Sequence, residues 1–206
     1  MTPAVPPPRA AVLVSGGGTN LQALLDARDA GTLGADVVLV VSNQPGVGAL
    51  DRAAKHGVPA EVISHRDYPS REAFDAALVA ALRARDVDLV VLAGFMRIVT
   101  RVLLDAFPGR VINVHPALLP SFPGVDAQAQ ALAYGVRVTG ATVHFVDAGV
   151  DTGPILAQAP VPVLDDDTVE TLRARILREE HRLLVGAVHA VATGRARVEG
   201  RRVRFA

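Results

Sequence analysis

The sequence has no cysteine among its 206 residues, which excludes disulfide bonds, thiolate metal sites and thiol nucleophiles. It also has no excess of charge, because 21 basic residues balance 21 acidic ones. A balanced charge gives no sign of a nucleic-acid-binding face or a membrane-binding patch. No apolar run is long enough to cross a bilayer. We therefore expect no nucleic-acid or membrane partner and take the cytoplasm as the compartment.

The composition is that of a globular protein, since half of the residues are hydrophobic and the mean hydropathy is +0.31. The length suits one large α/β domain with a substantial core. The first residues, "MTPAVPPPRA", are rich in proline and lack the apolar core of a signal peptide. We predict a disordered leader over residues 1–9 and a single domain over residues 10–206.

The first half of the chain alternates short apolar runs with helical patterns. Strands are predicted at residues 10–14, 37–42, 60–63, 88–92 and 111–114. Helices are predicted from Asn20 onward, at 47–56 and at 70–85, the last capped by Ser70. Strands that are apolar throughout and alternate with helices indicate a mostly parallel, Rossmann-like sheet covered on both faces. Such a sheet binds its ligands at the carboxyl ends of the strands.

The second half has a different pattern, which predicts a mixed sheet. Helices are predicted at residues 126–134 and 168–193, and strands at 139–145 and 155–163. The tail "ARVEGRRVRF" predicts a small hairpin that turns at Gly200. No linker divides the chain, so one α/β domain carries both halves.

Three consecutive glycines in "VLVSGGGTNLQAL" lie between a strand and a helix. Glycine allows close approach of the backbone to a bound group, and a helix N-terminus favours an anion. We expect Thr19 or Asn20 to cap this helix. The Walker pattern and the dinucleotide pattern both fail here. The loop therefore predicts either a phosphate site or a tight turn that packs the helix on the sheet.

Polar side chains follow one of the predicted buried strands in "INVHPALLPSFPG". Asn113 and His115 are two residues apart, so on an extended backbone they point the same way. A single histidine is often a structural residue. The prolines after His115 fix an irregular loop, which favours a site at this strand end.

Three other segments allow both a structural and a functional interpretation. "FMRIV" could be core or the apolar wall of a pocket for a flat ligand. Asp147 and Asp151 lie in a glycine-rich loop, where aspartate is common for turn chemistry. Glu179, Glu180 and His181 lie on the last helix, where charges usually face solvent.

A metal site would draw on His115, His144, Asp151 and His181, but no H-E-x-x-H or similar ligand spacing occurs. We therefore predict no metal. A serine hydrolase needs an elbow serine, and the chain contains no G-x-S-x-G around Ser15 or elsewhere.

Six segments taken together resemble the phosphoribosylglycinamide formyltransferase family of folate-dependent enzymes. They are "SGGGTNLQAL", "SREAFD", "LAGFMRIV", "INVHPALLPSFPG", "TGATVHFVDAGVDTGPIL" and "REEHRLL". Their order and spacing match from Val12 to about Leu184. The resemblance implies the formyltransferase fold, with the nucleotide side in the N-terminal half and folate and catalytic loops in the C-terminal half. It implies transfer of a formyl group from 10-formyltetrahydrofolate to the amine of glycinamide ribonucleotide, in purine biosynthesis, without a metal, by a monomer or homodimer.

The resemblance also implies roles for individual residues. The catalytic residues are Asn113, His115 and Asp151, for which the chemistry of an oxyanion donor, a proton donor and its carboxylate partner is suitable. The ribonucleotide site is implied at Gly18, Thr19, Asn20 and Glu180. The folate site is implied at Arg71, Met96, Arg97, Ile98, Val99 and Asn113.

The chain departs from the family pattern at Gly17, Ser121 and Asp126, where relatives commonly carry Asn, Lys and His. The alternatives are a formyltetrahydrofolate deformylase, in which water replaces the amine, a methionyl-tRNA formyltransferase, and a non-catalytic folate- or nucleotide-binding module. The glycine-rich loop argues against the first two, and the three candidate catalytic residues together argue against the third.

Overall fold

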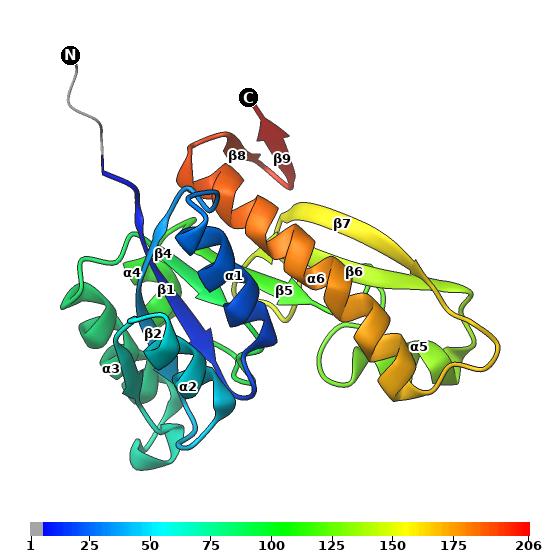
Figure 1. The fold of residues 1–206 in the computed structure, drawn as a ribbon, viewed down its shortest axis with the longest axis horizontal. Coiled ribbons are helices and arrows are strands. Elements are labelled where there is room, and N and C mark those ends of the chain that lie inside the picture. The colour runs from blue at the N-terminus through cyan, green and yellow to red at the C-terminus, as the bar shows by residue number, and fades with distance from the viewer. Residues whose placement is uncertain (1–5) are drawn as a thin grey trace.

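A computed structural model describes residues 6–206, in which seven strands form one mixed sheet with the order β3-β2-β1-β4-β5-β6-β7 (Figure 1). The parallel strands are β1 (Arg9–Val14), β2 (Asp36–Ser42), β3 (Ala60–Val62), β4 (Leu89–Leu92) and β5 (Val111–His115). The antiparallel strands are β6 (Val138–Phe145) and β7 (Ile155–Pro162). The predicted α/β class, parallel in the first half and mixed in the second, is confirmed.

The helices follow the predicted pattern closely. They are α1 (Thr19–Asp29), α2 (Gly48–Lys55), α3 (Arg71–Arg83), α4 (Arg101–Ala106), α5 (Ala127–Tyr134) and α6 (Val169–Ala192). Ser70 caps α3 as expected, because its hydroxyl accepts a hydrogen bond from the N–H of Ala73 at 3.1 Å. Helix α4 and the 3-10 turn η1 (His65–Asp67) were not predicted, since six and three residues are too short to show a helical period.

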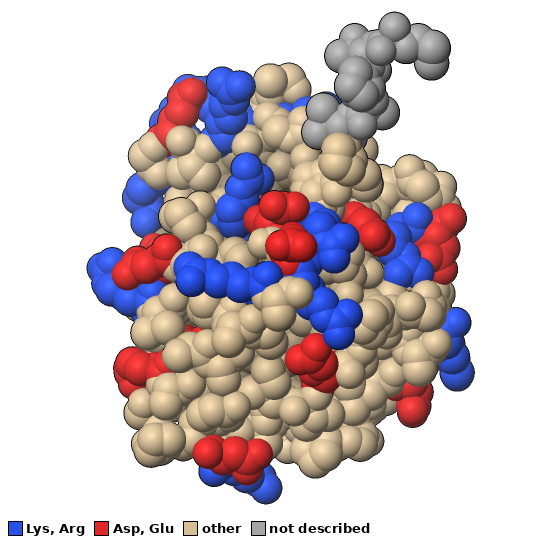
Figure 2. All heavy atoms as spheres, turned by 90° about the vertical axis from the view of Figure 1, so that its left-hand side faces the viewer, with Lys and Arg blue, Asp and Glu red and all other residues tan. Residues whose placement is uncertain are grey.

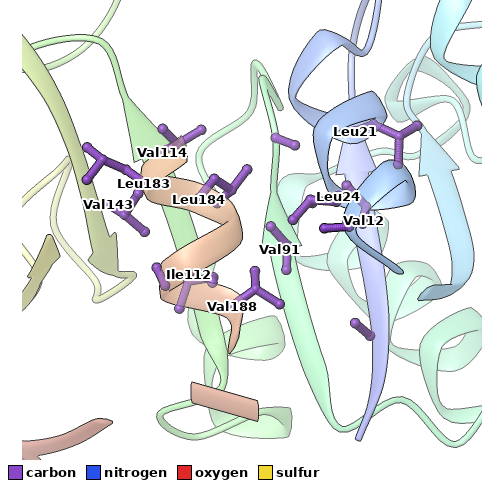
Figure 3. Close-up of a cluster of buried hydrophobic side chains, with 14 of the residues drawn as sticks. Val12, Leu21, Leu24, Val91, Ile112, Val114, Val143, Leu183, Leu184 and Val188 are labelled. Carbon is purple, nitrogen blue, oxygen red and sulfur yellow. The ribbon is translucent and has the colours of Figure 1, made fainter. Parts of the chain in front are cut away.

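Two hydrophobic cores cover the two faces of the sheet, and alternate residues of β1 enter different cores. Val12 and Val14 face α1 and α6, whereas Ala11 and Leu13 face α3 and α4. In Figure 3, three side chains of α6 lie over β5 and β6. They are Leu183, Leu184 and Val188. The inner strands such as β1 and β4 are therefore buried on both faces, which is why they are almost entirely apolar.

The C-terminal end of the chain lies outside this sheet (Figure 1). Of the predicted leader, residues 1–5 lie outside the described residues, and Arg9 already belongs to β1. The predicted C-terminal hairpin is present as β8 (Ala196–Glu199) and β9 (Arg202–Phe205), with Gly200 at a φ of 62°. Arg201 in this turn donates a hydrogen bond to the carbonyl of Thr152 at 2.9 Å.

The surface carries charges of both signs. Figure 2 shows Lys and Arg side chains lying beside Asp and Glu side chains on one face of the molecule, as the zero formal net charge leads one to expect. Among residues 6–206, none of the helices combines the length and the apolar character needed to cross a membrane.

Candidate active site

The polar segments singled out in the sequence meet at one edge of the sheet. Strands β1, β4 and β5 are parallel neighbours, so their carboxyl ends lie side by side. The glycine turn follows β1, the segment Met96–Val99 follows β4, and His115 is the last residue of β5. Antiparallel β6 then brings its loop, which contains Asp151, to the same strand. This is the position at which open α/β sheets bind ligands.

Asn113 is oriented by a histidine on the neighbouring strand. It lies directly opposite His144 in the β5–β6 pair, and its Nδ2 atom is 3.2 Å from the Nε2 atom of that ring. The Nδ1 atom of His144 is 2.8 Å from the carbonyl of Phe145, and since a carbonyl only accepts, Nδ1 carries a proton. In the neutral ring Nε2 then accepts from Asn113, and in the protonated ring it donates to Asp151 instead. The amide of Asn113 keeps one N–H for a ligand.

His115 is 4% exposed, and both of its ring nitrogens have neighbours. Its Nε2 atom donates to the carbonyl of Phe122 at 2.8 Å, and its Nδ1 atom is 3.4 Å from a carboxylate oxygen of Asp151. Burial lowers the pKa of His115, and the Asp151 charge and the Phe122 carbonyl oppose that shift only partly. These two contacts hold the ring in one orientation, with the Nδ1 atom facing Asp151.

Asp151 lies between the two histidines, and its side chain is 12% exposed. One carboxylate oxygen is 3.5 Å from Nε2 of His144, and the other accepts the N–H of Gly124 at 2.8 Å. Burial alone would raise the pKa of Asp151, but the contacts with His144, Gly124 and His115 outweigh it and lower the pKa. The structure thus brings the three predicted catalytic residues together as a charged acid–base cluster.

The glycine turn is built differently from the prediction at its cap. Gly18, not Thr19 or Asn20, occupies the N-cap of α1, and no side chain caps this helix. Gly18 has a φ of 73°, and a Cβ atom there would lie 2.7 Å from the Cβ atom of Ala49 on α2. Only glycine suits this left-handed, tightly packed position. The prediction of a side-chain cap is wrong because Thr19 already lies inside the helix and the amide of Asn20 is used elsewhere.

The carbonyls of the turn face α2, so the N-terminus of α1 is left open to a ligand. The N–H of Ala49 donates to the carbonyl of Gly16 at 3.2 Å, and Nε of Arg52 donates to the carbonyl of Gly17 at 2.8 Å. The first N–H groups of α1 have no partner within the helix, as at every helix start. The positive end of the helix dipole therefore points at the edge where the strands end.

Glu180 and Asn20 meet although 160 positions separate them. The Nδ2 atom of Asn20 donates to a carboxylate oxygen of Glu180 at 2.8 Å, and both side chains are buried. Burial raises the pKa of Glu180, and the hydrogen bond from Asn20 opposes that shift. Glu180 on α6, whose charge could have faced solvent, is thus buried beside the glycine turn.

A hollow of about 320 Å³ adjoins this pair. Thr19 and Gln22 from α1, Arg52 from α2 and His181 from α6 line it. The Nε2 atom of His181 is buried without a hydrogen-bond partner among the described residues. Burial lowers the pKa of His181, and the charge of Arg52 lowers it further. The hollow thus carries one guanidinium, one imidazole and the carboxylate of Asp26 next to the turn.

The segment after β4 exposes apolar side chains that a soluble fold normally buries. Met96 is 70% exposed and Ile98 is 52% exposed, whereas Val99 points into the core. Ser15, which precedes the glycines, accepts the N–H of Met96 at 2.8 Å. The buried carboxylate of Asp75 accepts both the N–H and the hydroxyl of Thr100. The segment is therefore fixed at both ends and open to a ligand between them.

Two further features lie beside this segment. Arg71 is exposed at the first position of α3, and Arg97 has a buried Nε atom without a partner among the described residues. A second hollow of about 410 Å³ lies between α4 and the loop that leads to Asp151. Leu104, Phe107 and Val146 give it apolar walls.

The side chains considered for a metal separate into two places. His115, His144 and Asp151 lie together, whereas His181 lines the hollow beside the glycine turn. Within residues 6–206, no group of three or more His, Cys, Asp or Glu side chains could hold a metal ion.

Sequence reasoning did not find the roles of several residues of the site. His144 was considered only as a candidate metal ligand, and only the antiparallel register places it opposite Asn113. Phe122 contributes its carbonyl, which no side-chain motif reveals. Arg52 and Ser15 act through backbone atoms of the glycine turn and of the segment after β4.

Known proteins resemble this chain over nearly its full length. The formyl transferase family matches residues 8–188. The phosphoribosylglycinamide formyltransferase of Mycobacterium tuberculosis is 55% identical over 195 residues, which are 95% of this chain and 90% of that protein. The crystal structure of glycinamide ribonucleotide transformylase 1 from Symbiobacterium toebii has a TM-score of 0.94 at 55% identity, covering 96% of this chain and 93% of that one.

Some relatives are much longer or more distant. The trifunctional purine biosynthetic protein adenosine-3 of Drosophila melanogaster is 51% identical over 190 residues, and the match covers 91% of this chain but 14% of that protein. The chain therefore spans about one seventh of the length of that relative. A formyltetrahydrofolate deformylase structure from Pseudomonas syringae has a TM-score of 0.89 at 26% identity, covering 97% of this chain and 66% of that one.

Proposed function

Because the chain belongs to the formyl transferase family, we propose that it moves a formyl group from 10-formyltetrahydrofolate to the amine of N1-(5-phosphoribosyl)glycinamide, a step of purine biosynthesis. The observation that carries the proposal is the meeting of Asn113, His115 and Asp151 at the carboxyl edge of β5. An amide donor, a buried imidazole and a carboxylate are the groups that acyl transfer to an amine requires.

Asn113 stabilises the negative charge that develops when the amine attacks the formyl carbon. The attack forms a C–N bond and turns the carbonyl oxygen into an oxyanion. The Nδ2 atom of Asn113 has one N–H held toward His144, and the other is available to that oxygen. A preorganised donor of this kind acts more strongly in the tetrahedral intermediate than in the substrate.

His115 and Asp151 manage the proton that the reaction moves. The attacking amine loses one proton, and the folate nitrogen gains one when its bond to the formyl carbon breaks. Asp151 is held ionised, as its lowered pKa shows, and it favours the protonated form of His115. The positive charge of the imidazolium then stabilises the nearby oxyanion. His115 exchanges its proton through Nδ1, the ring nitrogen that faces Asp151.

The ribonucleotide site lies around the glycine turn. Gly18, Thr19 and Asn20 form the start of α1, where backbone N–H groups and the helix dipole favour a phosphate. Glu180 lies beside Asn20, in a position to accept hydrogen bonds from sugar hydroxyls. This site distinguishes the proposed reaction from hydrolysis, which requires no phosphate-bearing substrate.

The folate site lies along the exposed segment after β4. The apolar side chains of Met96 and Ile98 supply a wall for a flat ring, with Arg97 between them, while Val99 contributes its backbone. Arg71 at the start of α3 suits an anionic end of the ligand. The hollow between α4 and Val146, which Arg101 and Asp147 also line, is the pocket that we assign to the pterin ring.

A spectrophotometric assay of folate product tests the proposal. We expect rapid product formation only when glycinamide ribonucleotide is present. Equal turnover with water as the acceptor would support the deformylase alternative instead. Tight binding of both ligands without any turnover would support the non-catalytic alternative.

A further inference from the structure

The loop that follows His115 is held at its base by two polar side chains, of which Thr142 is buried and Gln158 is exposed. The hydroxyl of Thr142 on β6 donates to the carbonyl of Ala117 at 2.6 Å and accepts the N–H of Leu119 at 3.1 Å. Gln158 on β7 donates to the carbonyl of Leu119 at 2.9 Å. These contacts fix the loop only up to residue 119, whereas the contacts with the active site come later.

The later part of the loop touches both members of the acid–base pair. The carbonyl of Phe122 accepts the Nε2 proton of His115, and the N–H of Gly124 donates to Asp151. Phe122 has a φ of 54°, in the left-handed region that a bulky residue rarely adopts. Such a conformation persists only where the surroundings hold it.

Gln130 on α5 makes hydrogen bonds to this part of the loop. Its Nε2 atom is 3.2 Å from the carbonyl of Pro123 and 2.8 Å from the carbonyl of Val125. Pro123 and Val125 alternate along the chain with the two residues that contact His115 and Asp151. One side-chain amide thus contacts the carbonyls of the two residues that flank Gly124, and the side chain is half-buried.

We propose that Gln130 is a positioning residue for catalysis, which holds the loop of residues 122–125 so that the Phe122 carbonyl orients His115 and the Gly124 N–H orients Asp151. The inference rests on the proposed function of that pair. Gln130 makes no contact with the reacting groups itself and acts through two backbone groups.

The consequence for His115 has a definite sign. The groups that face His115 are Asp151 from the loop after β6, His144 from β6 and the Phe122 carbonyl. Burial lowers the pKa of His115, while Asp151 and the Phe122 carbonyl raise it. If the loop loosens, the support of the Phe122 carbonyl is lost and the pKa of His115 falls further. The Nε2 proton also loses its partner, while the Asp151 carboxylate still faces Nδ1, so the neutral ring shifts from the Nε2–H tautomer toward the Nδ1–H tautomer.

The experiment compares two substitutions in the full-length protein. Gln130→Met keeps the length of the side chain but has no donor, and Gln130→Lys keeps a donor that reaches both carbonyls. We expect Gln130→Met to lower kcat about tenfold, the scale of two lost hydrogen bonds of modest strength, with the KM for the ribonucleotide unchanged. We expect Gln130→Lys to keep most of the activity.

The decisive readout is the 15N NMR signal of His115 in the free protein, assigned with His115→Gln. In Gln130→Met it should move toward the Nδ1–H tautomer and titrate at a lower pH. Unchanged His115 signals would overturn the proposal, even with a lower kcat. Equal losses in the Met and Lys variants would also overturn it, because they would indicate a packing role. Since the NMR readout needs no substrate, it succeeds or fails independently of the proposed reaction.

Tyr134→Ala is the matched control on the same helix. Tyr134 is 79% exposed and its ring packs edge-on against Phe122, with 5.9 Å between ring centroids. It touches the same loop residue through the side chain, not through the carbonyl. We expect the His115 signals to stay at their wild-type positions. A shift as large as that of Gln130→Met would assign the hold to ring packing and contradict the role of the Gln130 amide.

Discussion

Asn113 and His144 lie directly opposite each other in the antiparallel β5–β6 pair, with 3.2 Å between Nδ2 and Nε2. The His144 proton lies on Nδ1, where it meets the carbonyl of Phe145. In the neutral ring, Nε2 therefore accepts a hydrogen bond from the Asn113 amide. This hydrogen bond sets the orientation of the Asn113 side chain. A histidine on the neighbouring strand thus orients the amide that we propose as the oxyanion donor.

Replacing Asn113 by Ala removes the donor for the oxyanion. We expect kcat to fall roughly 10²–10³-fold, as for other oxyanion donors, with little change in ribonucleotide affinity. Turnover at saturation of both substrates measures the effect, and a thermal melt shows that the protein stays folded. A folded Asn113→Ala protein with near-normal turnover would remove Asn113 from the mechanism.

Replacing Asp151 by Asn removes the charge beside His115 but keeps the shape. Burial lowers the pKa of His115, and the Asp151 charge opposes this, so the pKa should fall further in the variant. If protonated His115 supports turnover, the loss of kcat with rising pH should begin at a lower pH. A pH–rate profile with an NMR titration of His115 measures this, and a raised His115 pKa would contradict the assignment.

Substitutions at two neighbouring residues of the glycine turn should affect ligand binding differently. Gly18→Ala places a Cβ atom against Ala49 at a positive φ, so we expect a lower melting temperature and weaker binding of both ligands. Thr19→Val keeps the size of an exposed side chain but removes its hydroxyl. It should raise the KM for the ribonucleotide about tenfold, the scale of a hydrogen bond to a charged group, and leave that for folate unchanged. Equal effects of Thr19→Val on the KM values of both ligands would indicate that the turn has a purely structural role.

Glu180→Gln tests the buried carboxyl on α6. Burial raises the pKa of Glu180 in the folded protein above its unfolded value of about 4.3. The wild type therefore loses stability as the pH rises from the unfolded pKa to the folded pKa, because the ionised carboxyl is buried. The melting temperature of Glu180→Gln relative to wild type should rise between pH 4 and pH 8, while the ribonucleotide KM increases.

Glu179→Gln is the control for this prediction. Glu179 is the preceding residue on α6 and pairs at the surface with Arg182. Its substitution should change neither the pH dependence of stability nor the ribonucleotide KM. If the two variants behave alike, the effect belongs to the charge of the helix and not to the buried pair with Asn20.

The sequence by itself determined the order of the elements and the edge at which the site lies. Continuous apolar runs such as residues 10–14 and 37–41 required strands buried on both faces, and the alternation with helices made the first half of the sheet parallel. The side of the strand shared by Asn113 and His115 followed from the two-residue period of a strand. These properties depend on local patterns, which a sequence displays directly.

Only the tertiary structure decided which distant residues meet. The contacts of Asn20 with Glu180 and of Asn113 with His144 depend on how α6 and β6 pack, and no local period encodes them. The cap of α1 was mispredicted for the same reason, since the packing of Ala49 selects glycine at position 18. Backbone groups such as the Phe122 carbonyl carry no side-chain signature. Their role arises when the chain folds and places them against a titratable ring.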